Sequence, residues 1–277
     1  MRYFTIGCIA PILVLISINI SLADIGIIVA FNSNLEQIKK SLKIKEISKK
    51  AGREFYSGKI NNIDVVLVRS PMGKVNNAIT AQALLSHYPI TSVVSIAPAG
   101  SINKGLNIGD IIIATEVFQH DFGTIKPYGF IWSRVPDGTN RDEPGYNLAD
   151  KRLRKLALLY ANNKKKTKNR IIEGIIVTGD QFISAQNKKE WLFKKFKAMA
   201  VDMGAGAIAQ VCYANRVSFC ILRIITDKAK IGARINFEKS IPGYQSDIDI
   251  LKFVKGILQR SQNKRVAVHG LKLEIGK

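Results

Sequence analysis

Six segments of this sequence hold residues that could do chemistry, because each follows a strand-like apolar run. Ligands in open α/β sheets bind beyond the carboxyl ends of the strands, so residues in this position are candidates for a binding site. The segments are residues 30–34, 70–74, 97–101, 178–183, 203–206 and 226–227.

The pattern at residues 204–209 indicates one possible ligand. It is G-x-G-x-x-A, it lies between a strand-like run and a helical pattern, and Asp227 ends the next strand-like run. In dinucleotide-binding proteins such glycines approach a pyrophosphate and the acid binds a ribose hydroxyl. Here the pattern lies far from the first strand, and short Gly/Ala patterns also arise from close helix–strand packing. We therefore predict no nicotinamide cofactor.

Metal and nucleophile motifs are missing from the sequence, which has no G-x-S-x-G elbow and no Walker loop. The histidines have no zinc-like spacing to a cysteine, and they are His87, His120 and His269. We expect His120 and Asp121 to form a structural hydrogen-bonded pair. Cys212 and Cys220 could pair in an oxidising compartment, but we expect buried thiols in a helix and the strand after it. No metal site is predicted.

Seven apolar runs predict the strands that would position these residues, and most are continuous, as is typical of a sheet covered on both faces. The runs are Ile25–Phe31, Ile63–Arg69, Val93–Ala97, Asp110–Thr115, Ile171–Thr178, Ala198–Met203 and Phe219–Ile225. Helical patterns occur at Leu35–Lys50, Lys74–His87, Leu148–Asn162, Lys188–Phe196, Ala205–Ala214 and Ser246–Arg260. This alternation predicts one α/β domain with helices on both faces of the sheet.

The N-terminal segment has the features of a secretory signal peptide. Arg2 is followed by an apolar stretch over Phe4–Ile20 and by a small-residue cleavage pattern at residues 21–23. The alternative is an uncleaved anchor, which Pro11 and Asn19 disfavour. We predict export to the periplasm or the cell surface, with a signal peptide over residues 1–23, a domain over residues 24–260 and a basic tail over residues 261–277.

The chain also carries a large excess of positive charge, with 42 Lys and Arg against 21 Asp and Glu. It is 47% hydrophobic, which excludes a disordered polycation. The densest basic run predicts a polyanion-binding loop made of Lys164, Lys165, Lys166, Lys168 and Arg170. For an exported protein the partner would be a glycosaminoglycan-like polyanion rather than a specific nucleic acid sequence. The alternative is that this run is only a solvated surface.

A series of motifs in a fixed order gives the chain a resemblance to a known family. The motifs include Ser70–Ala78, Ala99-Gly100, His120-Asp121, Thr178–Ile183, Val201–Met203 and Leu222–Asp227. From about residue 24 to residue 260 the chain resembles the 5′-methylthioadenosine/S-adenosylhomocysteine nucleosidases of the nucleoside phosphorylase superfamily. The resemblance implies a single-domain, three-layer α/β/α fold with a central mixed sheet. It also implies a homodimer, in which Tyr128 or Phe130 could close the pocket across the interface.

The resemblance further implies a reaction, the hydrolysis of the bond between adenine and ribose in a purine nucleoside. Adenine must be protonated as it leaves, and Asp227 aligns with the general acid that does this, with Thr226 beside it and Arg223 near the ribose. The implied substrate-binding residues are Phe182, Ile183, Met203, Met72, Asn34, Gly204, Ala99 and Gly100. Without the resemblance, the apolar members of this set would be expected in the core. Asp227 could equally be structural, paired with Arg223 or Lys228.

Two positions depart from the family pattern. The family's water-activating glutamate falls on Asn34, and loss of a positioned base typically costs about 10²–10⁴ in rate. The glutamate that binds the ribose hydroxyls falls on Gly204, which removes charged hydrogen bonds of about 1.5–3 kcal/mol each. The alternatives are therefore an impaired scaffold that binds polyanions, or a phosphorylase using Arg53 and Arg69. Residues 97–101 lack a basic residue, so we favour hydrolysis over phosphorolysis.

Overall fold

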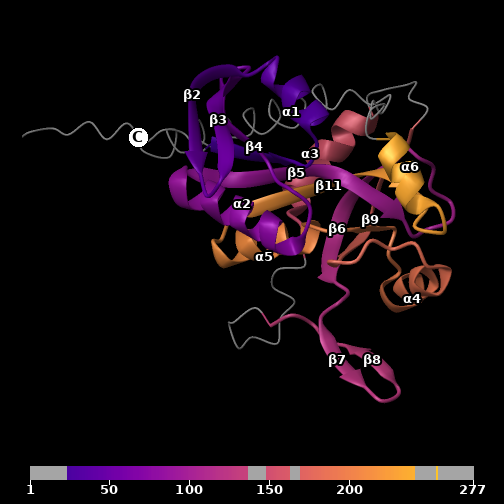
Figure 1. The fold of residues 1–277 in the computed structure, drawn as a ribbon. Coiled ribbons are helices and arrows are strands. Elements are labelled where there is room, and N and C mark those ends of the chain that lie inside the picture. Colours follow the sequence, from indigo (N-terminus) through magenta and orange to yellow (C-terminus); the bar gives the residue numbers. More distant parts are fainter. Residues whose placement is uncertain (1–23, 137–147, 163–168, 241–253, 255–277) are drawn as a thin grey trace, which may run out of the picture.

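A central mixed sheet carries the fold in the computed structural model, which describes residues 24–136, 148–162, 169–240 and Val254 (Figure 1). Within these residues the sheet has nine strands, in the order β10-β9-β6-β11-β5-β1-β4-β3-β2. They are β1 (Asp24–Val29), β2 (Lys43–Lys50), β3 (Arg53–Ile60), β4 (Ile63–Arg69), β5 (Ile90–Ser101), β6 (Ile111–Gln119), β9 (Ile171–Thr178), β10 (Ala200–Asp202) and β11 (Ser218–Asp227). A separate hairpin joins β7 (Gly123–Lys126) and β8 (Gly129–Trp132).

Helices cover both faces of this sheet. They are α1 (Asn32–Lys39), α2 (Lys74–His87), α3 (Lys151–Asn162), α4 (Gln186–Phe196), α5 (Ala205–Ala214) and α6 (Ala233–Ser240). On one face α1 and α3 pack their apolar side chains against alternate residues of β1, β4 and β5. On the other face α2 and α5 pack against the intervening residues of the same strands. The predicted α/β fold, with a central mixed sheet and helices on both faces, is confirmed.

Strand direction explains how distant segments come together. The strands β4, β1, β5 and β11 run parallel to one another, whereas β6 is antiparallel to β11, and β9 and β10 run with β6. The long strand β5 also pairs at its end with β10, in antiparallel register, through Ser101 with Ala200 and Gly100 with Val201. This pairing sets β10 beside the last residues of β5, although the two strands run in opposite directions.

The predicted helix over Leu35–Lys50 is wrong in its second half, because Lys43–Lys50 is a strand. The helix α1 ends at Lys39, and β2 then pairs with β3 through a tight turn in which Ala51 and Gly52 both have positive φ. This strand lies at the edge of the sheet and is almost entirely exposed. Its lysines are the residue type that protects an edge strand from pairing with other chains. Pairing with β3, a strand that we did not predict, decides the conformation here.

The other predicted elements agree with the structure to within a few residues, and α2, α5, β4 and β9 have the predicted bounds. Cys212 in α5 and Cys220 in β11 are buried free thiols, and burial raises the pKa of each to about 12. The hairpin β7–β8 and helix α6 were not predicted. The predicted signal peptide, the basic tail and the helix Ser246–Arg260 lie outside the described residues, apart from Val254. None of the described helices is long and apolar enough to cross a membrane.

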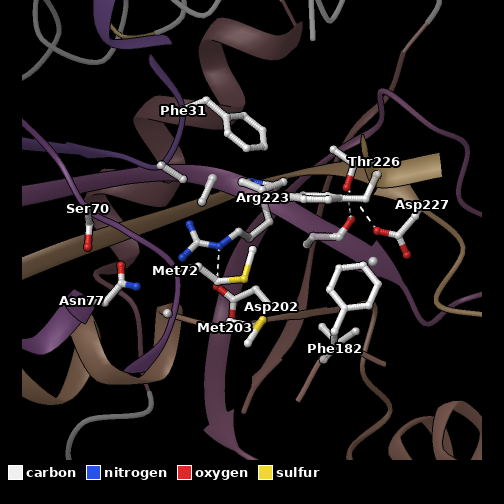
Figure 2. A pocket seen from close by; sticks show the side chains of 18 of the residues that line it. Phe31, Ser70, Met72, Asn77, Phe182, Asp202, Met203, Arg223, Thr226 and Asp227 are labelled. Carbon is white, nitrogen blue, oxygen red and sulfur yellow. Dashed lines mark hydrogen bonds and ion pairs between the residues drawn. The ribbon is translucent and has the colours of Figure 1, made fainter. Parts of the chain in front are cut away.

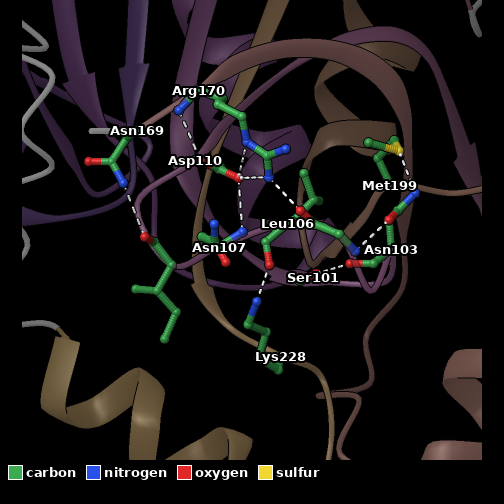
Figure 3. A network of polar contacts seen from close by, with 11 residues as sticks. Ser101, Asn103, Leu106, Asn107, Asp110, Asn169, Arg170, Met199 and Lys228 are labelled. Atoms are coloured by element: carbon green, nitrogen blue, oxygen red, sulfur yellow. Dashed lines mark hydrogen bonds and ion pairs between the residues drawn. The ribbon is translucent and has the colours of Figure 1, made fainter. Parts of the chain in front are cut away.

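A polar network anchors the loop between β5 and β6 (Figure 3). The Asp110 carboxylate is buried and accepts hydrogen bonds from the Arg170 guanidinium at 2.6 Å and from the Asn107 backbone N–H at 2.8 Å. Burial opposes ionisation of this carboxyl, but these hydrogen bonds outweigh it and lower the pKa of Asp110. Lys228, next to Asp227, donates to the Leu106 carbonyl in the same loop. The network therefore ties the end of β11 to the rest of the sheet.

We expect Asp110→Asn to lower the free energy of unfolding by about 1.5–3 kcal/mol, because it removes charged hydrogen bonds from a buried site. The control is Asp64→Asn, which removes an exposed ion pair with Lys59 and should cost about 1 kcal/mol or less. The stability that Asp110 provides should be lost as the pH falls through its lowered pKa. Urea unfolding would measure both variants, and equal losses for the two would contradict this assignment.

Candidate active site

Residues from all six segments that the sequence analysis singled out line one pocket of about 320 Å³ (Figure 2). Its walls come from the loops after β1, β4 and β9 and from the ends of β5, β10 and β11. The lining includes Met72, Ala99, Gly100, Phe182, Ile183, Met203, Gly204, Arg223, Thr226 and Asp227. Nearly all the predicted substrate-binding residues, and all three predicted catalytic residues, therefore lie around one cavity.

Asp227 is a buried carboxyl group at the end of β11. Its Oδ1 accepts a hydrogen bond of 2.8 Å from the Ala229 backbone N–H, and its Oδ2 lies 3.2 Å from the Thr226 hydroxyl. Burial raises the pKa of Asp227, although these hydrogen bonds and the positive charge of Lys189 oppose the shift. A carboxyl with a raised pKa retains its proton at higher pH, which is what a general acid requires.

The alternative role for Asp227, a structural ion pair with Arg223 or Lys228, does not occur among the described residues. Arg223 pairs with Asp202 instead, and the Lys228 ammonium donates to the Leu106 carbonyl. No ion pair to Asp227 occurs within the described part of the chain. Gly100 packs closely against this group, because a Cβ at that position would lie 2.9 Å from the Asp227 Oδ1. The glycine therefore makes room for the carboxyl.

Arg223 and Asp202 form a buried ion pair in the wall of the pocket. The Arg223 Nε donates to the Asp202 Oδ2 at 2.6 Å, and its Nη1 lies 2.9 Å from the Leu222 carbonyl. The other Asp202 oxygen accepts a hydrogen bond of 2.5 Å from the Thr178 hydroxyl. The Ala205 backbone N–H at the start of α5 also donates to the Asp202 Oδ2. Each oxygen of Asp202 is therefore already engaged by the protein, and Arg223 is held in one orientation.

Three aromatic side chains form one end of the pocket. Phe182 packs edge-on against Phe237 of α6 with ring centroids 5.7 Å apart, and Phe31 lies 5.9 Å from Phe237. Ile183 is buried beside this group, in a small cluster under α4. Phe182 and Ile183 were predicted, but Phe237 was not, because the sequence pattern did not indicate α6. The apolar end suits a flat aromatic ring.

Asn34 differs from the expectation, because it is absent from the residues that line the pocket. The helix α1 begins at Asn32, and Asn34 lies on its buried side with Leu35 and Ile38. Its side chain is 1% exposed, and its Oδ1 has no hydrogen-bond partner among the described residues. Phe31, just before the helix, takes a place in the pocket wall instead.

The predicted hydrogen-bonded pair of His120 and Asp121 is also wrong. Asp121 instead accepts hydrogen bonds from the Lys74 ammonium at 2.7 Å and from the Asp180 backbone N–H at 2.8 Å. Neither ring nitrogen of His120 has a partner among the described residues, and the ring is fully buried against Gly179. Burial, with the nearby charge of Lys188, lowers the pKa of His120 to about 4, so the ring is neutral at pH 7. The contacts of Asp121 with Lys74 and with the Asp180 backbone fix the loop that carries Phe182.

The residues predicted for the dimer contact and for polyanion binding lie away from the pocket lining, whereas Arg69, which a phosphorylase would use, belongs to that lining. Tyr128 and Phe130 belong to the projecting β7–β8 hairpin, where Tyr128 is exposed and Phe130 contacts Trp191. Arg170 is held by Asp110, and the other members of the predicted polyanion loop lie outside the described residues: Lys164, Lys165, Lys166 and Lys168. No group of three or more His, Cys, Asp or Glu side chains suited to a metal ion occurs among the described residues.

Comparisons with known proteins agree with this geometry. The family model of the phosphorylase superfamily matches residues 24–249. A 5′-methylthioadenosine/S-adenosylhomocysteine nucleosidase of Buchnera aphidicola is 37% identical over 216 residues, which are 77% of this chain and 82% of that protein. One from Bacillus cytotoxicus is 32% identical over 236 residues, which are 85% of this chain and 98% of that protein.

Solved structures show the same likeness. The nucleosidase of the same name from Neisseria meningitidis, in complex with methylthio-immucillin-A, has a TM-score of 0.75 and 26% identity. The match covers 86% of this chain and 100% of that one. A futalosine hydrolase of Helicobacter pylori has a TM-score of 0.72 and 28% identity, covering 86% of this chain and 98% of the other.

The raised pKa of Asp227 predicts a pH-dependent effect of Asp227→Asn on stability. The folded protein binds this proton more tightly than the unfolded chain, so the associated stability is present below the ordinary pKa of 3.8 and is lost as the pH rises through the raised value. The asparagine never ionises and keeps an acceptor for the Ala229 N–H. We therefore expect the variant to gain stability relative to wild type as the pH rises. A difference in urea unfolding free energy that stays constant with pH would contradict the raised pKa.

Proposed function

This chain belongs to the 5′-methylthioadenosine/S-adenosylhomocysteine nucleosidases of the phosphorylase superfamily, and we propose that it hydrolyses the N-glycosidic bond of such nucleosides with Asp227 as the general acid. The observation that carries the proposal is the buried Asp227 carboxyl, with its raised pKa, at the edge of a pocket that has an aromatic end. A neutral carboxyl there can donate a proton to the purine N7 while Phe182 stacks on the ring.

The reaction has a simple proton and electron balance. The glycosidic electron pair leaves with the purine as the ribose becomes oxocarbenium-like, and the proton from Asp227 makes the leaving adenine neutral. Water then adds to the ribose carbon and releases a proton, which can return to the Asp227 carboxylate through solvent. The low polarity around Asp227 favours its protonated form at the start of this cycle.

The acidic residues of the pocket lining lead us to expect slow turnover. The only acidic residues in the described lining are Asp202 and Asp227, and Asp202 is already engaged by Arg223, Thr178 and the start of α5. No carboxylate there is available to take a proton from the attacking water, and a positioned base is typically worth about 10²–10⁴ in rate. Hydrolysis in this chain therefore rests on leaving-group protonation more than on activation of water.

Release of adenine from methylthioadenosine and S-adenosylhomocysteine tests the proposal. We expect purified wild-type protein to release adenine, and Asp227→Asn to lower kcat by about 10²–10⁴ because the acid is removed. The wild-type kcat/KM should fall as the pH rises through the pKa of Asp227. Inorganic phosphate should not accelerate the reaction, as it would in a phosphorylase.

Asp180→Asn is the matched control, because Asp180 is an exposed carboxylate near the pocket but not in its lining. We expect this variant to keep activity within a few-fold of wild type. Turnover in Asp227→Asn equal to that of wild type would exclude Asp227 as the acid, and no turnover in wild type would exclude hydrolysis of these nucleosides.

We also propose that the protein is an exported homodimer. Support for the dimer is the apolar exposure of Val75 and Ile79 on α2 and of Ile125 and Tyr128 on the β7–β8 hairpin. Support for export is the N-terminal sequence pattern alone, and the polyanion-binding role stays a prediction based on the +21 charge. Light scattering at micromolar concentration should give twice the mass of the mature chain, and a mature N-terminus at Asp24 would show cleavage. A monomeric mass would exclude the dimer.

A further inference from the structure

The ribose end of the pocket contains an asparagine that the sequence patterns did not single out. Asn77 lies in the first turns of α2, and its side chain belongs to the pocket lining. Figure 2 shows Asn77 and Ser70 together at one end of the pocket, opposite Phe182 and Asp227. If the purine lies between Phe182 and Asp227, as the proposed function requires, the sugar extends toward Asn77.

Asn77 fills the space that a side chain at position 204 would need. A Cβ built on Gly204 would lie 2.6 Å from the Asn77 Cγ, 2.6 Å from its Nδ2 and 2.8 Å from its Oδ1. Real Cβ atoms do not approach other atoms so closely, so no larger residue fits at position 204 while the amide is in place. The absence of a side chain at Gly204 and the presence of the amide at Asn77 are thus two parts of one arrangement.

Backbone contacts also fix the orientation of this amide. The Asn77 Nδ2 donates to the Gly73 carbonyl at 2.9 Å and to the Pro71 carbonyl at 3.2 Å. Both N–H groups are therefore used, and the assignment of nitrogen and oxygen follows because carbonyls accept only from the NH₂ group. The Oδ1 accepts no hydrogen bond from the described residues. Its lone pairs are available to a ligand in the pocket.

Among the other acceptors near the sugar end, both oxygens of Asp202 are engaged by protein donors. The Ser70 hydroxyl donates to the Pro71 carbonyl at 3.2 Å and keeps its lone pairs, so Ser70 is the competing acceptor that the variants below must separate from Asn77. A ribose presents two hydroxyl donors, each of which loses hydrogen bonds to water when it enters the pocket. A fixed and unoccupied amide oxygen in this position can replace one of these bonds.

We propose that Asn77 is the ribose-binding residue of this chain, and that its Oδ1 accepts a hydrogen bond from a ribose hydroxyl in the place where Gly204 provides no carboxylate. The proposal rests on the proposed function for the direction in which the nucleoside lies. A neutral amide oxygen forms a weaker hydrogen bond with a hydroxyl than a charged carboxylate does. The pocket therefore selects nucleosides with an intact ribose, but more weakly than a carboxylate would.

The test compares methylthioadenosine with its 2′-deoxy and 3′-deoxy analogues, by adenine release and by calorimetric Kd. We expect wild type to prefer the intact ribose to one of the analogues by about 3–10-fold. Asn77→Ala should lose this preference while keeping the analogue's own Kd within a few-fold. The control is Gln82→Ala, an exposed change on the same helix outside the pocket lining, which should keep the wild-type preference.

A pair of variants at position 204 tests the spatial argument. Gly204→Glu alone should weaken nucleoside binding, because its Cβ collides with the Asn77 amide. Asn77→Ala combined with Gly204→Glu should bind better than Gly204→Glu alone and should restore the preference for the intact ribose. Near-ultraviolet circular dichroism would confirm that each variant is folded.

The outcomes separate the two proposals. Absence of turnover with a ribose preference in Kd that Asn77→Ala abolishes would overturn the hydrolysis and support the role of Asn77. Turnover with the same ribose preference in wild type and Asn77→Ala would overturn the role of Asn77 and leave the hydrolysis standing. Loss of the preference in Ser70→Ala but not in Asn77→Ala, or absence of any preference in wild type, would equally overturn it.

Discussion

The buried ion pair between Arg223 and Asp202 is the interaction on which the site depends. Both side chains are almost wholly removed from solvent, so each charge is tolerable only because the other is present and both are hydrogen-bonded. The pair joins β11, in the middle of the sheet, to β10, which lies between β9 and the end of β5, and Asp202 also binds Thr178 at the end of β9 and the start of α5. Three segments that line the pocket are thus held by one carboxylate.

This arrangement leaves different chemistry at the two ends of the pocket. At one end Asp227 is buried without an ion-pair partner among the described residues, so burial raises its pKa and favours the protonated carboxyl. At the sugar end the charges of Arg223 and Asp202 satisfy each other, and the lining offers neutral acceptors from Asn77 and Ser70. The pocket is therefore suited to protonate a leaving base and less suited to activate water.

Much of this could be predicted from the sequence. The continuous apolar runs indicated a sheet covered on both faces, and the helical pattern of α2 and α5 gave their correct bounds, because burial imposes its period locally. Lys43–Lys50 was wrongly predicted as a helix, because an exposed edge strand has no apolar face and its conformation depends on pairing with β3. The predicted contact between His120 and Asp121 failed for a similar reason, since Lys74 and Asp180 compete for the same carboxylate.

The sequence by itself determined the α/β fold class, the six segments that form the pocket, and Asp227 as the candidate acid. The fold class and the six segments follow from apolar periodicity, which is a property of neighbouring residues, and the role of Asp227 follows from the resemblance to the family. Only the tertiary structure decided that Asn34 lies outside the pocket, that Asp202 is occupied by Arg223, and that Asn77 fills the space above Gly204. Each of these depends on contacts between residues far apart in the chain, whose distances are set by how the strands pair and the helices pack.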